Sequence, residues 1–340
     1  MTPAEAIEQL LQGTPLSREQ ARGVMDQVMA GESTPVQIAG VVIALRAKGE
    51  TVEEMAGFVD SMRAHATPLQ APDGAIDTCG TGGDRAGTFN ISTAAAMVAA
   101  GAGVPVAKHG NRAASSRCGS ADVLEALGVD ITLGPHGVES CLQAAGMGFC
   151  FAPTFHPAMR HAGPTRRELG VRTVFNVLGP LANPAHVRHQ ALGVGARGLA
   201  PLMIRVLRDL GHERALVFYG EDGLDELTTT GPSHVFQLID SELSDYELDP
   251  QDLGIKRASA ADLLGGTPAE NARLITDVLN GEAGPRRDVV LLNGAAALIA
   301  AGRANDWRQA LAQAADSLDS RQAAAVLEKL VKTSQSATGT

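Results

Sequence analysis

The sequence predicts an α/β protein in which a small N-terminal α-helical domain precedes a larger α/β domain with a central, mostly parallel sheet. The first 70 residues carry only helical patterns. From residue 71 onward, short apolar runs alternate with helical stretches, as in βαβ units. A chain of 340 residues also exceeds the usual size of one domain. We therefore expect a helical domain at 1–70, joined by part of 160–190, an α/β domain at 71–333 and a frayed tail at 334–340.

Helix start signals define the N-terminal domain. Ser17 is a suitable N-cap for a helix that runs to about residue 30, and Thr34 followed by Pro35 marks the next helix start. Thr51 opens a further helix that has acidic residues in its first turn. Four short helices of this kind can pack into a bundle, and we expect their exposed faces to form the contact surface of a homodimer.

The α/β domain begins after a turn cluster at 71–74. Five apolar runs predict buried strands, at 75–78, 104–107, 148–151, 191–194 and 215–219. Helical patterns lie at 92–102, 120–127, 135–145 and 198–210. Because parallel strands need crossover connections, this alternation favours a largely parallel sheet. Beyond residue 219 the pattern is mixed and ends in Ala-rich helices.

The composition excludes several classes of protein. With 44% hydrophobic and 19% charged residues, the chain is typical of a globular protein rather than a disordered one. A net charge of −10 argues against a general nucleic-acid binder, which would present a basic face. The N-terminal residues lack the features of a targeting signal, and the uncharged stretch at 86–107 is too rich in Ala, Gly and polar residues for a membrane span. The four cysteines lack C-x-x-C spacing, so we expect reduced thiols and a cytoplasmic protein.

Glycine is abundant and aromatic residues are scarce. The chain has 38 glycines, and aromatic residues make up 3% of it. The core must therefore consist mainly of Ala, Val, Leu and Ile. The many glycines also leave much of the backbone free of side chains.

A glycine-rich loop follows the first expected strand. The segment 77–84 reads D-T-C-G-T-G-G-D, and N-I-S-T at 90–93 then opens a helix. Glycines let backbone N–H groups approach an anion closely, and a helix N-terminus adds a favourable dipole. The spacing matches neither the Walker A pattern nor G-x-G-x-x-G. Taken by itself, the loop is either a phosphate-binding loop or a structural turn.

A polar loop follows the second expected strand. It reads K-H-G-N-R at 108–112 and A-A-S-S at 113–116. Its cations, amide and hydroxyl groups suit a polyanion, although clusters of this kind are commonly solvated loops. Because both loops follow parallel strands, they should lie at the same edge of the sheet, which favours a shared binding site.

Two charged segments complete the candidate site. Asp225 and Glu226 follow the fifth expected strand, and two adjacent carboxylates suit Mg²⁺ bound together with substrate phosphates. Arg166 and Arg167 can hold a carboxylate through paired hydrogen bonds. The alternatives are an acidic surface turn and surface salt bridges. Taken together, the four segments favour transfer from a sugar that carries pyrophosphate to an anionic co-substrate.

Five motifs in order resemble the anthranilate phosphoribosyltransferase family, within the nucleoside phosphorylase/phosphoribosyltransferase fold. They are G-T-G-G-D at 80–84, N-I-S-T at 90–93, K-H-G-N-R at 108–112, N-V-L-G-P-L-A-N-P at 176–184 and G-L-D-E at 223–226. The resemblance spans nearly the whole chain. It implies a homodimeric enzyme of tryptophan biosynthesis that joins anthranilate to phosphoribosyl pyrophosphate and releases pyrophosphate.

The resemblance also implies roles for individual residues. The ligands of phosphoribosyl pyrophosphate would be Gly80, Gly83, Asp84, Thr88, Asn90, Ile91, Ser92, Thr93, Lys108, His109, Gly110, Asn111, Arg112, Ala113, Ala114, Ser115, Ser116 and Ser120. Anthranilate would contact Gly80, Asn111 and Arg166, and two magnesium ions would bind at Ser92, Asp225 and Glu226. Lys108 and Arg166 would position the substrates and stabilise charge. No general base is assigned, because an aromatic amine is largely unprotonated at neutral pH and mainly needs positioning.

Two other functions stay open from the sequence. A pyrimidine nucleoside phosphorylase resembles this fold and also binds phosphate and ribose, but it has no need of a magnesium pair such as Asp225 and Glu226. A non-catalytic relative that binds nucleic acid through a basic groove is disfavoured by the intact loops and by the net charge of −10.

Overall fold

Seven strands form one sheet in the computed structural model, which describes residues 1–113 and 116–337. The strands are β1 (Ile76–Gly80), β2 (Val106–Gly110), β3 (Met147–Phe151), β4 (His189–Gly193), β5 (Arg214–Gly220), β6 (Ser233–Ile239) and β7 (Glu242–Leu248). Their order across the sheet is β3-β2-β1-β4-β5-β6-β7. The first five strands in that order pair in parallel, whereas β6 and β7 pair antiparallel at one edge. The predicted α/β class and mostly parallel sheet are confirmed.

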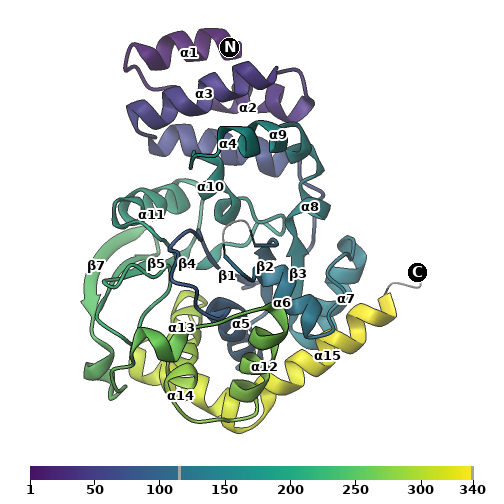
Figure 1. The fold of residues 1–340 in the computed structure, drawn as a ribbon, viewed down its shortest axis with the longest axis vertical. Coiled ribbons are helices and arrows are strands. Elements are labelled where there is room, and N and C mark those ends of the chain that lie inside the picture. Colours follow the sequence, from purple (N-terminus) through teal and green to yellow (C-terminus); the bar gives the residue numbers. More distant parts are fainter. Residues whose placement is uncertain (114–115, 338–340) are drawn as a thin grey trace.

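Four helices precede the sheet and form a bundle at one end of the molecule (Figure 1). They are α1 (Pro3–Leu11), α2 (Arg18–Ala30), α3 (Pro35–Lys48) and α4 (Val52–Ala64). Each begins at a capping box whose N-cap is Thr2, Ser17, Thr34 or Thr51. The predicted starts after Ser17, Thr34 and Thr51 are therefore confirmed, because a side-chain oxygen satisfies one free backbone N–H at each of them.

Eleven further α-helices surround the sheet and connect it to the bundle within the described ranges. They are α5 (Ile91–Gly101), α6 (Ser120–Ala126), α7 (Pro135–Ala145), α8 (Ala152–Phe155), α9 (Gly163–Leu169), α10 (Phe175–Leu178), α11 (Ala200–Asp209), α12 (Pro268–Leu279), α13 (Pro285–Ala300), α14 (Trp307–Asp319) and α15 (Gln322–Ala337). Figure 1 shows α9 and α10 between the bundle and the sheet, and α15 along the opposite side of the molecule. None of the helices in the described residues has both the length and the apolar character needed to cross a membrane.

The expected frayed tail is wrong for residues 334–337, which belong to α15. Ser334 is fully buried, and its hydroxyl accepts a hydrogen bond from the backbone N–H of Asp130 at 3.0 Å. The same hydroxyl donates to the carbonyl of Val331 at 3.0 Å. Tertiary contact therefore holds this polar segment in a helix, whereas residues 338–340 lie outside the described residues.

The sheet separates two hydrophobic clusters. On β5, Leu216 and Phe218 belong to the cluster that also contains α5, α13 and α15, whereas Ala215 and Val217 face the cluster that contains α11 and the bundle. This alternation follows the two-residue period of a strand. The bundle therefore shares one continuous core with a face of the sheet.

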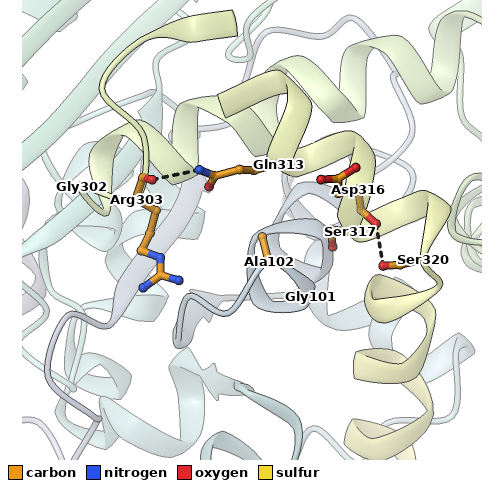
Figure 2. A pocket seen from close by; sticks show the side chains of 8 residues that line it. All are labelled: Gly101, Ala102, Gly302, Arg303, Gln313, Asp316, Ser317 and Ser320. Atoms are coloured by element: carbon orange, nitrogen blue, oxygen red, sulfur yellow. Dashed lines mark hydrogen bonds between the residues drawn. The ribbon is translucent and has the colours of Figure 1, made fainter. Parts of the chain in front are cut away.

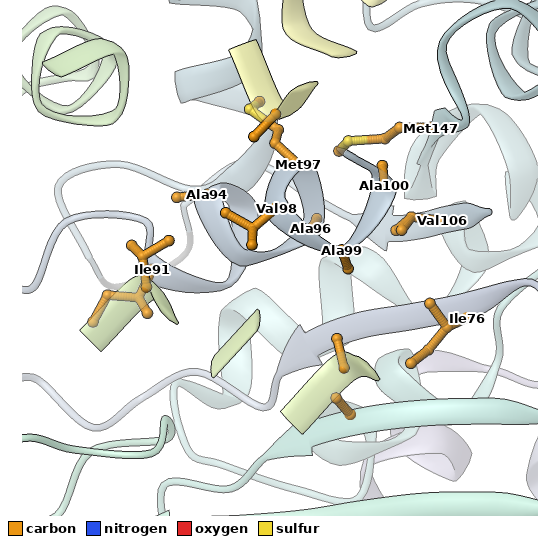
Figure 3. Packing of buried hydrophobic residues seen from close by; sticks show 14 of the residues in the cluster. Ile76, Ile91, Ala94, Ala96, Met97, Val98, Ala99, Ala100, Val106 and Met147 are labelled. Atoms are coloured by element: carbon orange, nitrogen blue, oxygen red, sulfur yellow. The ribbon is translucent and has the colours of Figure 1, made fainter. Parts of the chain in front are cut away.

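The scarcity of aromatic residues has a structural counterpart in α5. Nearly all side chains of this helix are buried, and most are Ala or other small residues. Figure 3 shows alanines of α5 close to Ile76 of β1 and Val106 of β2. On its other side, a Cβ atom added to Gly101 would lie 2.3 Å from Ser317 Oγ and 2.6 Å from the backbone nitrogen of Ala323. Small residues let α5 fit between the sheet and the C-terminal helices.

The five predicted strands are confirmed to within one or two residues at most boundaries, but the β6–β7 hairpin was not predicted. Its turn residues Asp240 and Ser241 both have positive φ, at 49° and 74°. Such two-residue turns usually contain glycine, but this turn reads Asp240-Ser241 in place of the usual Asn-Gly or Asp-Gly. Moreover, β7 is largely exposed and carries acidic residues, so it lacks the apolar run of a buried strand.

We predict that Glu54→Ala destabilises the protein. The buried Glu54 carboxylate accepts hydrogen bonds from the backbone N–H groups of Leu16 at 2.9 Å and Thr51 at 2.8 Å, and it pairs with Lys48 at 2.9 Å. Removing it leaves these donors unsatisfied, so the free energy of unfolding should fall by about 3 kcal/mol. Urea unfolding measures this, with the exposed Glu53→Ala in the same helix turn as control. Equal losses in the two variants would contradict the prediction.

Candidate active site

One cleft lies at the carboxyl ends of the parallel strands, where ligands bind in open α/β sheets. Its volume is about 580 Å³, and its walls are the loop after β1 with the start of α5, the loop after β2, the segment 170–176, and residues 225–226 after β5. Every expected ligand of phosphoribosyl pyrophosphate and magnesium that the structure describes lies on its wall. Ala114 and Ser115, also expected there, lie outside the described residues.

Glycines bring the loop after β1 against the acidic segment. Gly82 and Gly83 have φ of +67° and +83°, which side-chain-bearing residues rarely adopt. The backbone N–H of Gly82 donates to Asp225 Oδ2 at 2.6 Å. A Cβ atom on Gly80 would lie 2.3 Å from the same oxygen, so only glycine fits there without displacing Asp225. The loop therefore needs its glycines both for its turn and for this close approach.

The N-terminus of α5 faces the second acidic residue. The backbone N–H of Ser92 donates to Glu226 Oε1 at 3.1 Å. Asn90, at the N-cap position, makes no capping bond, because its amide instead donates to the carbonyl of Cys118 at 3.1 Å and accepts from Asn271 at 2.8 Å. Asn90 thus ties α5 to the loop after β2. Ile91 is buried in the core, so only its backbone is available to a ligand.

Burial perturbs both carboxylates of the acidic segment. The pKa of Asp225 is raised to about 7, mainly by burial and then by the negative charge of Asp84. The pKa of Glu226 is raised to about 8 by burial and by Asp225, against the opposing effect of Lys108. Two adjacent carboxylates, one half-buried and one buried, are a favourable place for a divalent cation, which would stabilise their charged forms.

No group of three or more His, Cys, Asp and Glu side chains stands ready for a metal ion in the part of the chain that the structure describes. A cation at Asp225 and Glu226 would therefore need further oxygen ligands from a bound substrate or from water. This fits Mg²⁺, which typically binds through one or two carboxylates together with substrate phosphates. The Ser92 hydroxyl, next to the N–H that contacts Glu226, is a further oxygen on the same wall.

Lys108 is a buried residue of the cleft wall. Only 1% of its surface is exposed, and its ammonium group donates to the carbonyl of Thr78 and to Ser92 Oγ, the latter at 3.4 Å. The buried Asp77 lies below it and accepts hydrogen bonds from the backbone N–H of His109 at 3.1 Å and from Asn183 at 2.9 Å. Burial raises the pKa of Asp77 to about 6, whereas the charge of Lys108 lowers it. Lys108 thus places a positive charge directly beneath the start of α5.

The ring of His109 is buried and neutral. Its pKa is lowered to about 3, mainly by burial and then by the neighbouring His156, whose ring centroid lies 5.0 Å away. Its Nδ1 atom bonds to the carbonyl of Gly179 at 3.1 Å. In the described part of the chain, Nε2 of both histidines is buried without a hydrogen-bond partner. His109 is therefore an uncharged polar group on the cleft wall.

The next residues of the loop after β2 contact residues of α6. A Cβ atom on Gly110 would lie 2.3 Å from Ser120 Oγ, which donates to the carbonyl of Asn111 at 3.3 Å. Arg112 pairs with Asp122 at 3.1 Å and with Glu125 at 2.8 Å, and these bonds raise the pKa of its guanidinium. Two carboxylates therefore already neutralise Arg112.

Arg166 stands apart from the other expected residues. Its guanidinium lies 5.4 Å from the centroid of the Phe175 ring and is not on the wall of the cleft. Burial lowers its pKa, and no hydrogen bond or ion pair engages it within the described residues. The cleft wall instead includes Asn176, the first residue of the motif at 176–184, and Arg172, which the sequence did not single out. The signal for Arg172 was its place in the same charged segment as Arg166.

A second cavity of about 420 Å³ lies at the opposite edge of the sheet, beside the C-terminus of α5 (Figure 2). Its two drawn hydrogen bonds run from Gln313 to the carbonyl of Arg303 at 3.1 Å and from Ser320 to the carbonyl of Asp316 at 2.6 Å. The first bond joins α14 to the segment after α13, and the second lies at the C-terminal end of α14. The cavity gathers none of the expected site residues, so the chemistry is assigned to the cleft.

We predict that Gly193→Ala disturbs the acidic segment. Gly193 ends β4, and a Cβ atom there would lie 1.7 Å from the carbonyl oxygen of Asp225. The backbone at 225–226 would have to move, which should lower the free energy of unfolding by about 1–3 kcal/mol. Gly198→Ala is the control in urea unfolding, because nothing lies within 4 Å of its added Cβ atom. Unchanged stability in Gly193→Ala would contradict this close packing.

Comparison with known proteins identifies the family. Residues 72–324 match the model "Glycosyl transferase family, a/b domain", and residues 4–66 match "Glycosyl transferase family, helical bundle domain". The anthranilate phosphoribosyltransferase of Roseiflexus castenholzii is 53% identical over 332 residues, which cover 97% of this chain and 98% of that protein. The enzyme of the same name from Moorella thermoacetica is 53% identical over 326 residues, 96% of each chain.

Solved structures agree with this result. The crystal structure of anthranilate phosphoribosyltransferase from Thermus thermophilus superimposes with a TM-score of 0.92 at 45% identity, covering 97% of this chain and 99% of that one. The Saccharomyces cerevisiae enzyme in complex with PRPP and Mg gives a TM-score of 0.90 at 27% identity, covering 98% of each chain. The chain described here belongs to the anthranilate phosphoribosyltransferase family of glycosyl transferases.

Proposed function

We propose that this chain transfers the phosphoribosyl group of phosphoribosyl pyrophosphate to the amine of anthranilate, giving N-(5-phosphoribosyl)anthranilate and pyrophosphate in tryptophan biosynthesis. The observation that carries this function is the contact between the glycine turn and the acidic segment, where Gly82 N–H meets Asp225 at 2.6 Å. It brings the glycine turn beside carboxylates that can hold a cation. Related yeast structures contain PRPP and Mg, or 4-fluoroanthranilate.

The donor site comprises the loops after β1 and β2. We assign phosphoribosyl pyrophosphate to the cleft residues between Gly80 and Thr93 and between Lys108 and Ser120 named above. A Cβ atom on Gly82 would meet nothing within 4 Å, so the turn leaves open space on the cleft wall for phosphate oxygens. The N-terminus of α5 favours their negative charge. Residues Asn90 and Ser120 contribute mainly by fixing the loops, since their side chains already bond to neighbouring segments.

Magnesium belongs to the same site. We assign two ions to Asp225, Glu226 and Ser92, whose carboxylates and hydroxyl are oxygen ligands of the kind Mg²⁺ prefers. When bound, Mg²⁺ neutralises negative charge on the departing pyrophosphate. The raised pKa values of Asp225 and Glu226 support this assignment, because a cation would return both carboxylates to their charged forms.

The transfer breaks the bond from ribose C1 to the pyrophosphate oxygen and forms a bond from C1 to the anthranilate nitrogen. The amine lone pair supplies the electrons of the new bond, pyrophosphate leaves with those of the old one, and the nitrogen releases a proton. Positive charge develops on the sugar as the leaving group departs. The role of Lys108 is electrostatic: its buried charge beneath Ser92 favours anionic phosphate in the cleft.

We assign Arg166 to bind the anthranilate carboxylate. Gly80 and Asn111 are the other residues that we assign to anthranilate. Its support is chemical: the guanidinium is partly buried and has no anionic partner within the described residues. A guanidinium stays protonated near neutral pH even when its pKa falls, and it can bind a carboxylate through two parallel hydrogen bonds.

We further propose a cytoplasmic homodimer. Leu11, Val36 and Ile43 on the neighbouring helices α1 and α3 are 69%, 80% and 41% exposed. Exposed large apolar side chains on two helices that contact each other are compatible with a protein contact, and a second copy of the chain fits the implied family assembly. All four cysteines are buried and free of disulfides, which is usual in a reducing compartment.

The central test is the loss of anthranilate fluorescence with purified protein. We expect loss only when both phosphoribosyl pyrophosphate and Mg²⁺ are present, and a chelator should abolish it. If anthranilate fluorescence did not fall in a donor-dependent way, the proposed function would be overturned.

In the same assay, Asp225→Asn should raise the Mg²⁺ concentration for half-maximal rate about tenfold, because it removes one charged ligand of the ion.

The control for the metal test is Glu221→Gln, in the same loop. Glu221 pairs with Arg197 at 2.5 Å and does not lie on the cleft wall. We expect its Mg²⁺ requirement to match that of the unmodified protein. If Asp225→Asn required no more Mg²⁺ than Glu221→Gln and the unmodified protein, Asp225 would not be a ligand of the metal.

Arg166→Ala should act on the acceptor alone. Loss of a charged hydrogen-bond pair to the anthranilate carboxylate should raise the KM for anthranilate by about 10- to 100-fold, with little change in the KM for phosphoribosyl pyrophosphate. Initial rates with each substrate varied in turn measure the split, and the exposed neighbour Arg167→Ala is the control. Equal rises for both substrates would refute the assignment.

A further inference from the structure

We propose that Arg172 is a positioning residue for the phosphoribosyl donor, holding the Gly82–Gly83 turn in its binding conformation, and that Arg46 of the helical bundle holds Arg172 in turn. This inference rests on the proposed function, because it assigns the donor to the cleft that this turn borders. It adds a residue on the cleft wall that none of the five sequence motifs contains.

The guanidinium of Arg172 lies directly against the turn. Its Nη1 donates to the carbonyl oxygen of Gly82 at 3.1 Å. A Cβ atom built on Gly83 would lie 1.5 Å from the same nitrogen, so a side chain at 83 would occupy the space that the guanidinium fills. The contact thus depends on a glycine at 83 for space as well as for its positive φ.

Arg172 and Asp225 hold Gly82 through its two backbone groups. The N–H of Gly82 donates to Asp225 and its carbonyl accepts from Arg172. Because Gly82 and Gly83 are both in the left-handed region and glycine is conformationally free, such a turn keeps one shape only when its surroundings fix it. The two hydrogen bonds hold both backbone groups of Gly82, so the turn that borders the cleft is kept in one arrangement.

The charge of Arg172 is not neutralised by any carboxylate within ion-pair distance in the described ranges. Arg112 differs, since Asp122 and Glu125 both pair with it on the same cleft. A guanidinium whose partner is a neutral carbonyl keeps its positive potential at the edge of the turn. That potential favours an anion such as a diphosphate group in the adjacent cleft.

The helical bundle reaches this point through Arg46. Arg46, near the end of α3, donates from Nη1 to the backbone carbonyl of Arg172. Helix α3 also contacts α9, which leads into the segment that carries Arg172 (Figure 1). A chain of contacts therefore runs from α3 through Arg172 to Gly82. The bundle thereby takes part in shaping the donor site, although no residue of α1–α4 lies on the cleft wall.

The first test separates the two substrates in Arg172→Ala. Loss of the bond to Gly82 should raise the KM for phosphoribosyl pyrophosphate about tenfold, with unchanged KM for anthranilate and unchanged thermal stability because the side chain is exposed. Arg172→Lys should raise the KM for phosphoribosyl pyrophosphate by a smaller factor, because lysine keeps the positive charge although it lacks the planar fork of donors. A rise for anthranilate alone, or equal rises for both substrates, would overturn the proposal.

Arg205→Ala is the matched control. Arg205 is also an exposed arginine that donates to a backbone carbonyl, that of Pro201 at 2.7 Å, and it lies on α11 away from the cleft. Its kinetic constants should equal those of the unmodified protein. Inactivity of the unmodified protein with these substrates would refute the proposed function, whereas an active protein with unaltered Arg172→Ala kinetics would refute the role of Arg172 alone.

Direct binding gives a readout that does not depend on turnover. Calorimetry with inorganic pyrophosphate and Mg²⁺ should show affinity about tenfold weaker for Arg172→Ala and moderately weaker for Arg46→Met. The double variant should bind no more weakly than Arg172→Ala, because Arg46 acts through Arg172. Additive losses would show that Arg46 acts separately, and unchanged affinity in Arg172→Ala would overturn the proposal even if another variant fails to fold.

Discussion

The cleft depends on the close approach of two loops that lie far apart in the sequence. The glycine turn after β1 meets the acidic segment after β5 through the hydrogen bond from Gly82 to Asp225. Strand β4 lies between β1 and β5, so the acidic segment must cross its end, and it does so directly over Gly193. Side chains at Gly80 or Gly193 would push the two loops apart. Bare backbone at these positions is thus a condition for bringing phosphate donors and metal ligands together.

The close contact between these two loops also explains how an acidic protein can bind an anionic substrate. The site carries its negative charge at Asp225 and Glu226, whose pKa values are raised mainly by burial, with a further rise from Asp84 at Asp225 and from Asp225 at Glu226. Positive influences surround them: the ammonium of Lys108, the N-terminus of α5 and the guanidinium of Arg172. A magnesium ion with its phosphate ligands would balance these charges, so the net charge of −10 says little about the cleft.

Sequence reasoning located the main loops because their composition and their positions after strands both carry information. Gly-rich and Lys/Arg-rich segments at strand ends are poor core and plausible anion sites, and parallel strands must place them at one edge. By contrast, Gly193 and Arg172 act through contacts across the fold, and the only local signal was the place of Arg172 in the charged segment that contains Arg166. The β6–β7 hairpin lacks the usual turn residues, and the helical end of the chain depends on the buried Ser334.

The helical bundle is attached to the α/β domain chiefly by apolar packing. The pairs of Arg18 with Asp60 and Asp209 join α2, α4 and α11, but these side chains are 26–40% exposed, and such pairs typically contribute about 0–1 kcal/mol. A cluster that includes Phe58 and Leu181 instead continues from the bundle to one face of the sheet. This packing holds the bundle against the α/β domain, and Arg46 thereby meets the segment that borders the cleft. A contact as small as Arg46 with Arg172 can then transmit the position of α3 to the glycine turn, whereas a loosely tethered bundle could not.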